Sequence, residues 1–297
     1  MQTIELGQQF NKPFVIALGF FDCMHLGHRA LLDEAKNIAD KNNCLVAMFT
    51  FSNNHFKVLG KDTKLIYTLE ERQQIFEDLG VDLTVCAAFD KNFMAMKSEE
   101  FLGRLFSYDI KGVVCGFDYS CGSDIARSGD VVRYCNDKGV ECHVVGEVTV
   151  DGEKVSSTLV RNLLSGGNVE KANKLLSQNF FICGTVVHGR GVGHTIGFPT
   201  ANVEVPGDKL LPVGVYGGHV YIDGLRHKAI VNVGSKPTFG VDSQTLEAHI
   251  LDFAQDIYGK HIKVSLVEYL RGISKFQGVE QLCNQLRQDL ERVKLYD

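Results

Sequence analysis

The sequence PFVIALGFFDCMHLGHRALLDEA, residues 13–35, decides the fold of the first half of the chain. Its apolar run Pro13–Leu18 predicts a buried strand, and from Ala30 onward apolar residues recur at the spacing of an amphipathic helix. The glycine-flanked turn between them places His25 and His28 at or just before the helix start. Unpaired backbone N–H groups and the helix dipole favour an anion there, so this strand–turn–helix is typical of a phosphate-binding site.

Three interpretations of His25 and His28 stay open at this point. They could be structural histidines beside a turn aspartate, Asp22. The pattern D-x-x-H-x-x-H could also give a metal ion three ligands. Phosphate binding fits the glycine-flanked turn better than a metal does, and either histidine can carry a proton near neutral pH that offsets phosphate charge.

Length, charge and cysteine spacing limit the class of protein. A chain of 297 residues, 44% of them hydrophobic, is long enough for two domains. The net charge is −5 without a run of Lys and Arg, so we expect no nucleic-acid partner. The longest early apolar run, residues 14–21, is too short to span a membrane, and we expect a cytoplasmic protein without membrane association. The nine cysteines form no C-x-x-C pair, which indicates free, mostly buried thiols.

Strands and helices alternate up to about residue 150. Short apolar runs predict strands at 13–18, 44–51, 81–89, 112–117 and 142–148, with helical segments between them. Thr68 and Glu71 have the spacing of a capping box, so a helix is predicted to begin there and to end before Gly80. This alternation favours a Rossmann-like parallel sheet covered by helices, with ligands beyond the carboxyl ends of its strands.

The second half has a different periodicity. Short helices are predicted at 156–165 and 169–176, and beyond Phe180 the period changes to two. Alternating segments at 185–187, 214–216, 219–221, 229–231, 247–253 and 262–269, separated by turn residues, favour an antiparallel β-barrel. A last helix, with Val279, Leu282, Leu286, Leu290 and Val293 on one stripe, is expected to pack against it. The predicted domains are therefore 1–179 and 180–297.

The sequence SSTLVR, residues 156–161, is a second helix start suited to an anion. Ser156 and Thr158 offer hydroxyl groups, and Arg161 follows one turn after Ser157. Arginine stays charged and can bind phosphate through two hydrogen bonds. The alternative is a capped helix with a solvated arginine. The SSTLVR stretch lies in the same half as the histidine turn, and this favours phosphate binding.

The second half carries its own polar pattern. The segment GTVVHGRGVGHTIGFPTAN, residues 184–202, is not a dinucleotide fingerprint, because no helix follows it. Its glycines allow the backbone to approach a phosphate, and Thr200 and Asn202 offer oxygens to Mg²⁺. Glu247 and His249 share one face of a predicted strand. That face could be solvated, or the Glu247 carboxylate could take a proton from an attacking hydroxyl.

Together these stretches resemble the bacterial bifunctional riboflavin kinase/FMN adenylyltransferase (FAD synthetase) family over nearly the whole chain. The resemblance rests on stretches that occur in the family's order: GFFDCMHLGH (19–28), GFDYSCG (116–122), SSTLVR (156–161), GFPTAN (197–202), GVYGG (214–218), NVGSKPTFG (232–240) and EAHILDF (247–253). It implies a nucleotidyltransferase domain followed by a six-stranded riboflavin kinase barrel with a terminal helix.

The resemblance implies that the first domain transfers AMP from ATP to FMN, which yields FAD and pyrophosphate. The residues that fall on ATP-phosphate positions are His25, His28, Ser156, Thr158 and Arg161, and Asp118 falls on a substrate-contact position. No covalent intermediate is expected, so the protein's work is positioning and charge stabilisation.

For the second domain the resemblance implies phosphorylation of riboflavin to FMN by ATP. Thr200 and Asn202 match the residues that bind Mg²⁺ and ATP, and Glu247 matches the base that activates the ribityl 5′-hydroxyl. Arg271 is a candidate for the flavin pocket. The implied partners are small molecules, namely riboflavin, FMN and ATP, and the oligomeric state is not indicated.

The chain differs from the family pattern mainly in its first half. Cys23 replaces a usual glycine, and Thr50-Phe51-Ser52-Asn53-Asn54-His55 displaces the usual histidine by one position. One step along an extended segment turns a side chain to the opposite face. The alternative function is therefore a riboflavin kinase with weak or lost adenylyltransferase activity. A flavin-binding protein without turnover and a nucleotidyltransferase for another substrate are further alternatives.

Overall fold

The computed structural model describes residues 1–189, 193, 197–238 and 241–296, and of 235–238 and 241–244 it describes the backbone only. The chain forms two compact units, Met1–Ser157 and Thr158–Asp297. Residues 239–240 of the NVGSKPTFG stretch and residues 190–192 and 194–196 of the glycine-rich segment lie outside the described residues.

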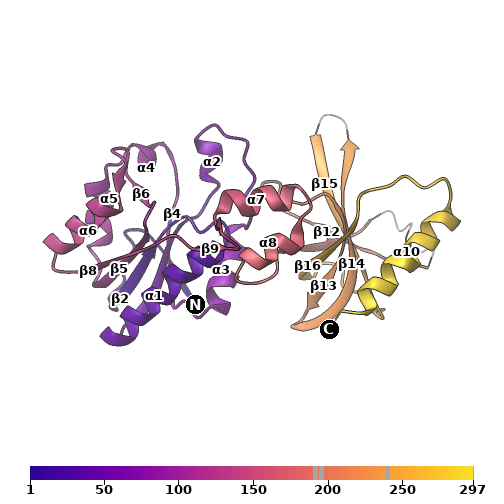
Figure 1. Cartoon of the computed structure of the whole chain (residues 1–297), viewed down its shortest axis with the longest axis horizontal. Helices are drawn as coiled ribbons and strands as arrows, with labels where there is room; N and C mark the ends of the chain where they lie inside the picture. Colours follow the sequence, from indigo (N-terminus) through magenta and orange to yellow (C-terminus); the bar gives the residue numbers. More distant parts are fainter. Residues whose placement is uncertain (190–192, 194–196, 239–240, 297) are drawn as a thin grey trace. The chain divides into compact units, whose positions relative to one another are not determined.

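The first unit is built on a six-stranded parallel sheet (Figure 1). In spatial order its strands are β1 (Gln2–Glu5), β4 (Leu83–Ala87), β3 (Leu45–Phe51), β2 (Phe14–Leu18), β5 (Ile110–Gly116) and β8 (Glu141–Val145). From β2 the chain adds strands on one side of the sheet and then crosses to β5 on the other side. Such a reversal opens a crevice beyond the carboxyl ends of the two neighbouring strands. The predicted phosphate turn, residues 19–28, begins at this crevice.

Helices cover both faces of the sheet. They are α1 (Leu26–Asn42), α2 (His55–Val58), α3 (Leu69–Asp78), α4 (Lys91–Ala95), α5 (Ser98–Leu105) and α6 (Ser128–Asp137). On one face α5 and α6 bury Phe101 and Val131 against Ile16 of β2. The helix α1 lies against β2, β3 and β5, with Leu32 and Ile38 buried. A parallel sheet covered in this way needs strands that are apolar on both faces, and β2 and β4 are buried throughout.

Two small hairpins follow strands of this sheet. The first pairs β6 (Ser120–Cys121) with β7 (Ala126–Arg127), and the second pairs β9 (Thr149–Val150) with β10 (Glu153–Lys154). Both hairpins therefore lie in connections that follow the carboxyl ends of β5 and β8.

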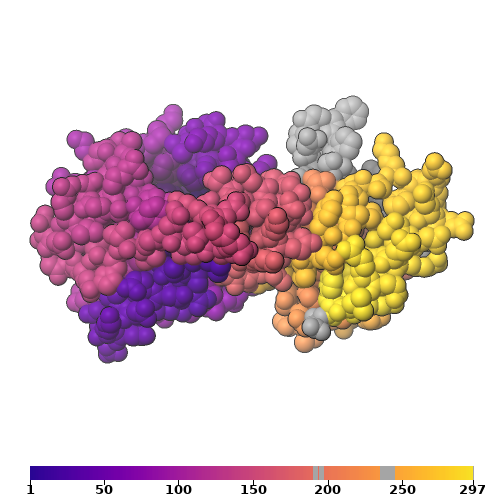
Figure 2. All heavy atoms as spheres, in the orientation of Figure 1, coloured from indigo at the N-terminus to yellow at the C-terminus, as the bar shows by residue number. Residues whose placement is uncertain are grey.

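The second unit is a closed antiparallel barrel of six strands. In order around the barrel they are β11 (Phe181–Val187), β12 (Ala201–Glu204), β15 (Val241–Ile250), β14 (Leu225–Thr238), β13 (Gly214–Ile222) and β16 (His261–Arg271). Helices α7 (Ser157–Ser165) and α8 (Val169–Leu175) precede the barrel, and α10 (Val279–Lys294) follows it. Val293 of α10 packs with Val215 and Ile230 of the barrel. Figure 2 shows the outer side of α10, in yellow, at the surface of this unit.

The structure confirms the predicted fold class and refines several elements. The segments 214–216 and 219–221 form one strand, β13, rather than two. Gly218 lies within this strand, where the backbone passes close to β16. A Cβ there would lie 1.9 Å from the Ser265 carbonyl oxygen, so the strand needs glycine at this position. The short strands β1 and β12, of four residues each, were not predicted. Val279, predicted on the packing stripe of the last helix, begins α10 and is 60% exposed.

The units also divide earlier along the chain than residue 179. The division falls at Ser157 because α8 packs on β16, where the Asn173 side-chain amide donates to the Leu266 carbonyl at 2.9 Å. Both short helices before the barrel therefore group with the second unit.

A buried arginine joins the ends of two central strands in the first unit. Arg72 of α3 is fully buried, and its guanidinium donates to the carbonyl oxygens of Phe20 (3.1 Å) and Phe51 (2.9 Å) and to the Thr50 hydroxyl. Burial lowers its pKa to about 10, and the nearby Asp22 carboxylate opposes that change, so the group stays charged at neutral pH. The predicted capping box positions this helix, since Thr68 and Glu71 bond each other's backbone N–H groups.

We expect Arg72→Met to lower the free energy of unfolding of the first unit by about 3 kcal/mol or more, because buried carbonyl groups lose their donor. Scanning calorimetry of the first unit's transition measures the change. Arg104→Met is the matched control, since Arg104 makes an exposed pair with Glu100 that contributes about 1 kcal/mol at most. Equal effects of the two substitutions would contradict the structural role of Arg72.

Candidate functional site

A cavity of about 230 Å³ opens at the crevice between β2 and β5. Its wall includes Gly19 after β2, Asp118 after β5, and the imidazoles of His25 and His28. Glu147, Lys154, Ser156 and Ser157 add to the polar lining, and we call this space the histidine cavity. The turn and the two serines of the SST stretch, predicted separately to bind phosphate, therefore contribute to one cavity.

The two histidines are fixed by the start of α1. His25 is its N-cap residue, and its Nδ1 accepts a hydrogen bond from the backbone N–H of His28 at 3.1 Å. The Nδ1 of His28 bonds the Cys23 carbonyl oxygen. The two rings stack with centroids 3.6 Å apart and an interplanar angle of 14°. Both histidines thus lie where the sequence predicted, at the helix start.

These bonds fix the proton positions on the two neutral rings. Since Nδ1 of His25 accepts, its proton is on Nε2, whereas His28 donates from Nδ1 and keeps a lone pair on Nε2. Burial lowers the pKa of His25 to about 2, with the second histidine adding to the effect. Burial also lowers the pKa of His28 to about 4, against the raising effect of its bond to Cys23. Both rings are therefore neutral near neutral pH in the protein without ligand, so the predicted proton requires a bound anion.

Asp22, the first of the three metal ligands that the D-x-x-H-x-x-H pattern could supply, does not lie in the histidine cluster. Asp22 is buried and its carboxylate accepts from the Ile66 backbone N–H at 3.0 Å. Cys23 takes its place in the cluster, because its sulfur and one nitrogen from each histidine lie within 4.8 Å of one another. However, stacked parallel rings do not direct their lone pairs at one point, and Nδ1 of His25 already accepts a bond. This geometry favours an anion over a metal ion.

A second, larger cavity of about 690 Å³ adjoins the first. Its wall is mainly aromatic and apolar: Phe20, Phe49, Phe51, Leu59, Phe89, Phe93, Met94, Met96, Phe101 and Ile125. We call it the aromatic cavity. Gly19, Asp118 and Tyr119 line both cavities, so Asp118 lies where the two spaces meet. A flat, apolar ligand in one cavity can reach a phosphate ligand in the other at this junction.

The altered segment 50–55 has a structural role beside the aromatic cavity. Asn54 caps α2 through the Phe56 N–H (3.1 Å) and donates to the Thr63 carbonyl (3.0 Å). The ring of His55 lies 4.1 Å from that of Phe20. In the first unit, which is described in full, His55 does not line the histidine cavity. The one-residue displacement therefore gives a capping residue and a packed imidazole.

The SSTLVR stretch begins α7. Ser156 and Ser157 line the histidine cavity, and the Cys23 thiol lies 3.6 Å from the Ser157 hydroxyl. Thr158 and Arg161 lie in the first two turns of α7, within the second unit. Their assignment to phosphate stays a prediction.

In the barrel, neighbouring strands bring the predicted polar residues together. Asn202 of β12 and Asn232 of β14 each pair in register with Glu247 of β15. Thr200 directly precedes β12, two residues before Asn202. A Cβ at Gly189 would lie 2.1 Å from the Asn202 amide nitrogen, so glycine lets the backbone reach this amide. These residues form a polar strip across three strands.

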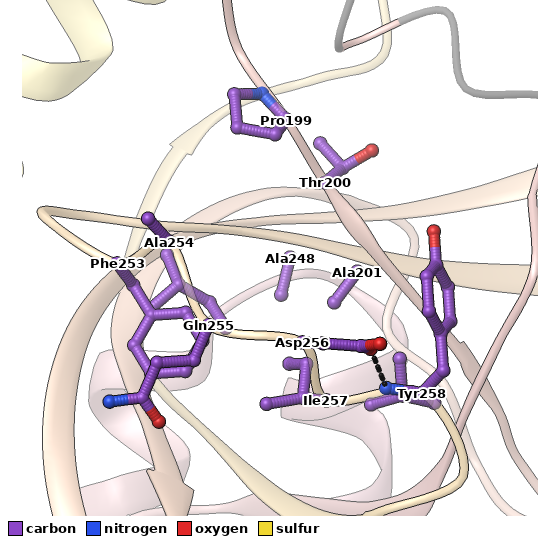
Figure 3. Close-up of a pocket in the computed structure, with 12 residues that line it drawn as sticks. Pro199, Thr200, Ala201, Ala248, Phe253, Ala254, Gln255, Asp256, Ile257 and Tyr258 are labelled. Atoms are coloured by element: carbon purple, nitrogen blue, oxygen red, sulfur yellow. Dashed lines mark hydrogen bonds between the residues drawn. The ribbon is translucent and has the colours of Figure 1, made fainter.

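Two cavities meet at this strip. One, of about 350 Å³, is lined by Thr200, Ala248, Phe253 and Asp256 among others (Figure 3). The other, of about 310 Å³, is lined by Thr200, Glu247 and His249 together with Phe276 and the α10 residues Leu282 and Leu286. Glu247 and His249 share a face, as predicted, and this face borders a cavity under α10.

Arg271, at the end of β16, ties α10 over that cavity. Its guanidinium makes a two-fold contact with the Asp289 carboxylate, at 3.0 Å from Nε and 2.9 Å from Nη2. Asp289 is buried and also accepts from Gln285 at 3.0 Å. Arg271 lines the cavity, but its charge is engaged by Asp289. Its place in the structure is therefore that of a residue that holds the helix.

Comparisons with known proteins agree with both halves of the structure. A family model described as FAD synthetase matches residues 7–159, and one described as riboflavin kinase matches residues 176–296. A bifunctional riboflavin kinase/FMN adenylyltransferase of Listeria monocytogenes is 35% identical over 99% of this chain and 95% of its own length. The chain belongs to this bifunctional family. Members from Bacillus subtilis and Escherichia coli K12 are each 33% identical, over 95% and 96% of this chain and 92% and 93% of their own lengths.

A solved structure from Streptococcus pneumoniae has the same fold. It covers 99% of both chains with a TM-score of 0.91 and 32% identity, and is described as a macrolide-efflux protein. Among the residues described for the present chain, no helix has both the length and the apolar character needed to cross a bilayer.

Sequence reasoning missed two parts of the first site. The aromatic cavity collects phenylalanines from segments far apart in the sequence, and only their abundance, 19 in the chain, signalled such a cluster. Lys154 contributes an ammonium group to the histidine cavity, 3.2 Å from the Asp118 carboxylate. Its signal was the Asp-Gly turn just before SST, which predicts a hairpin.

We expect Asp289→Asn to lower the free energy of unfolding of the barrel unit by about 3 kcal/mol, since it leaves the half-buried Arg271 unpaired. Because α10 lines the cavity that contains Glu247, the same substitution should weaken by about tenfold the binding of a flavin, the ligand that the family resemblance implies for this unit. Calorimetry and flavin fluorescence titration measure the two effects. Glu291→Gln, which removes an exposed carboxylate of the same helix, should change neither; an equal effect would refute the clamp.

Proposed function

We propose that this chain is an enzyme with two active sites that phosphorylates riboflavin to FMN and adenylylates FMN to FAD, using ATP in both steps. The observation that carries the proposal is a repeated arrangement. In each unit two cavities meet at a polar junction, Asp118 in the first and Thr200 in the second. A reaction between two bound substrates requires such adjacent sites, because their reacting atoms must come into contact. Both steps consume ATP and fit a cytoplasmic enzyme.

In the first unit the aromatic cavity takes the flavin ring of FMN and the histidine cavity takes ATP. An oxygen of the FMN phosphate attacks the α-phosphorus, the bond from that phosphorus to the bridging oxygen breaks, and pyrophosphate leaves. His25 donates from Nε2 to a phosphate oxygen, and the hydroxyl group of Ser156 adds a donor. No residue forms a covalent bond with the substrate.

His28 requires a change of charge to take part. Its Nε2 has a lone pair, which a phosphate oxygen repels. An adjacent anion favours the charged form of a histidine, so ATP raises the pKa of His28 and the ring binds a proton. The imidazolium then donates from Nδ1 to Cys23 and from Nε2 to the nucleotide.

In the barrel the cavity of Figure 3 takes ATP, and the cavity under α10 takes riboflavin. Glu247 removes the proton of the ribityl 5′-hydroxyl as this oxygen attacks the γ-phosphorus, and ADP leaves. Thr200 and Asn202 fit a magnesium ion, because their oxygens lie two residues apart and Gly189 leaves room beside the Asn202 amide. Mg²⁺ held by these two residues would offset the charge of the phosphates.

The test is a product assay with purified chain, riboflavin, ATP and Mg²⁺, in which the flavins are separated by chromatography. The proposal predicts FMN first and FAD later. FMN without FAD would identify a riboflavin kinase whose adenylyltransferase module has lost activity. The altered segment 50–55, in which Asn54 caps α2, would then be the first candidate for the cause. Flavin binding without ATP consumption would refute both activities.

Single substitutions should separate the two steps. Glu247→Gln should abolish FMN formation, by about 10³-fold or more in rate, while FMN is still converted to FAD. His28→Ala should have the opposite effect, because the phosphate site lies in the other unit. Each variant serves as the folding control of the other. If Glu247→Gln leaves the kinase rate unchanged, Glu247 is not the base.

ATP binding should take up a proton at His28. Because the pKa of His28 is about 4 without ligand and higher when ATP is bound, ATP affinity should fall as the pH rises between these two values. Calorimetric titration near neutral pH, in buffers of different ionisation enthalpy, measures the uptake. The His28→Asn variant should take up fewer protons. Protons that ATP itself or the barrel site binds or releases contribute equally to both proteins, so the difference reports on His28. Equal uptake would contradict the proposed charge change.

A further inference from the structure

The residues that line both cavities of the first unit, Gly19, Asp118 and Tyr119, include no lysine or arginine. Under the proposed function, the phosphate of FMN and the α-phosphate of ATP must meet near Asp118, whose carboxylate adds a third negative group. The histidines beside it are neutral without ligand. Two phosphates that come into contact repel each other, and a cation beside them offsets this repulsion.

Lys154 is positioned to supply that cation. Its Nζ lies 3.2 Å from a carboxylate oxygen of Asp118, 3.7 Å from one of Glu147, and 4.5 Å from the centre of the Phe117 ring. The lining of the histidine cavity falls wholly within the described residues, and Lys154 is its only lysine or arginine. Its ammonium therefore lies beside Asp118, the residue at which the two cavities meet.

The hairpin backbone fixes the Cα of Lys154, while the ammonium at the end of the side chain can change its partners. Asp151 and Gly152 have φ of 53° and 79°, the two positive values that a tight two-residue hairpin turn requires. The hairpin pairs Lys154 with Thr149, and Val155 then donates to the Val148 carbonyl at 3.0 Å. The Lys154 side chain is 41% exposed, and exposed ion pairs contribute little free energy. The ammonium can thus exchange carboxylates for phosphates at low cost.

We propose that Lys154 is a catalytic residue of adenylyl transfer. Its ammonium group leaves the carboxylates of Asp118 and Glu147 and binds the phosphates of ATP and FMN. Its charge offsets the repulsion as the FMN oxygen approaches the α-phosphorus and stabilises the pyrophosphate that leaves. Lysine is a compact point charge, suited to a group that must follow a moving phosphate. The assignment rests on the proposed FMN adenylyltransferase function.

The experiment compares Lys154→Ala, Lys154→Arg and Glu153→Gln with the wild-type chain. Glu153→Gln changes the exposed neighbour in the same hairpin and is the matched control. We expect Lys154→Ala to lower kcat/KM for FMN adenylylation by about 100-fold, while riboflavin kinase activity of the same sample is unchanged. The kcat/KM of Lys154→Arg should stay within about tenfold of the wild-type value, and that of Glu153→Gln should equal the wild-type value.

Rescue by small amines separates charge from structure. If the ammonium itself acts, ethylammonium ions should restore part of the adenylylation by Lys154→Ala, whereas tetramethylammonium, which cannot donate hydrogen bonds, should not. Wild-type kcat/KM in Lys154→Ala, or loss that neither arginine nor ethylammonium restores, would overturn the assignment. A wild-type chain that makes no FAD would overturn the adenylyltransferase function itself, and with it the role of Lys154.

Discussion

The first unit depends on one buried charge. The Arg72 guanidinium, carried by α3, bonds carbonyl groups directly after β2 and at the end of β3. Backbone that leaves a sheet has unsatisfied polar groups, and a single planar donor with five N–H groups satisfies several of them together. Phe20 and Phe51, whose carbonyl groups accept these bonds, line the aromatic cavity, and Gly19 beside Phe20 lines both cavities. The same hydrogen bonds therefore support part of the wall of each cavity.

The two units use different folds for a similar arrangement. At a reversal in a parallel sheet, two strand ends diverge and leave a crevice, and the histidine cavity occupies it. A closed barrel has no such crevice, so its cavities form where Thr200 precedes β12 and where α10 covers the face of Glu247. In both cases the polar residues lie at the boundary between an apolar space and a second space. This boundary is what a group transfer between two bound molecules needs.

Departures from the family pattern are accommodated by local structure. Asn54 satisfies the end of a short helix, and its neighbour His55 packs against phenylalanine rings. Cys23 is buried, with its thiol directed at the Ser157 hydroxyl. Neither Cys23, Asn54 nor His55 lines the histidine cavity. Its wall comes from the turn, the start of α1 and the hairpin of β9 and β10 rather than from the altered segment.

The sequence by itself determined the two fold classes and the helix start at His25, because periodicity, capping and strand alternation are local. It indicated Asn202 and Glu247 separately, but strand pairing brought them together with Asn232. It could not indicate that Arg72 is buried, since a charged residue is buried only when distant carbonyl groups surround it. Nor could it assign the protonation of the histidines, which burial and the Cys23 carbonyl decide together. The aromatic cavity, the position of Lys154 and the clamp between Arg271 and Asp289 likewise join residues far apart in the chain. Tertiary structure alone decided them, because only folding brings such residues within contact distance.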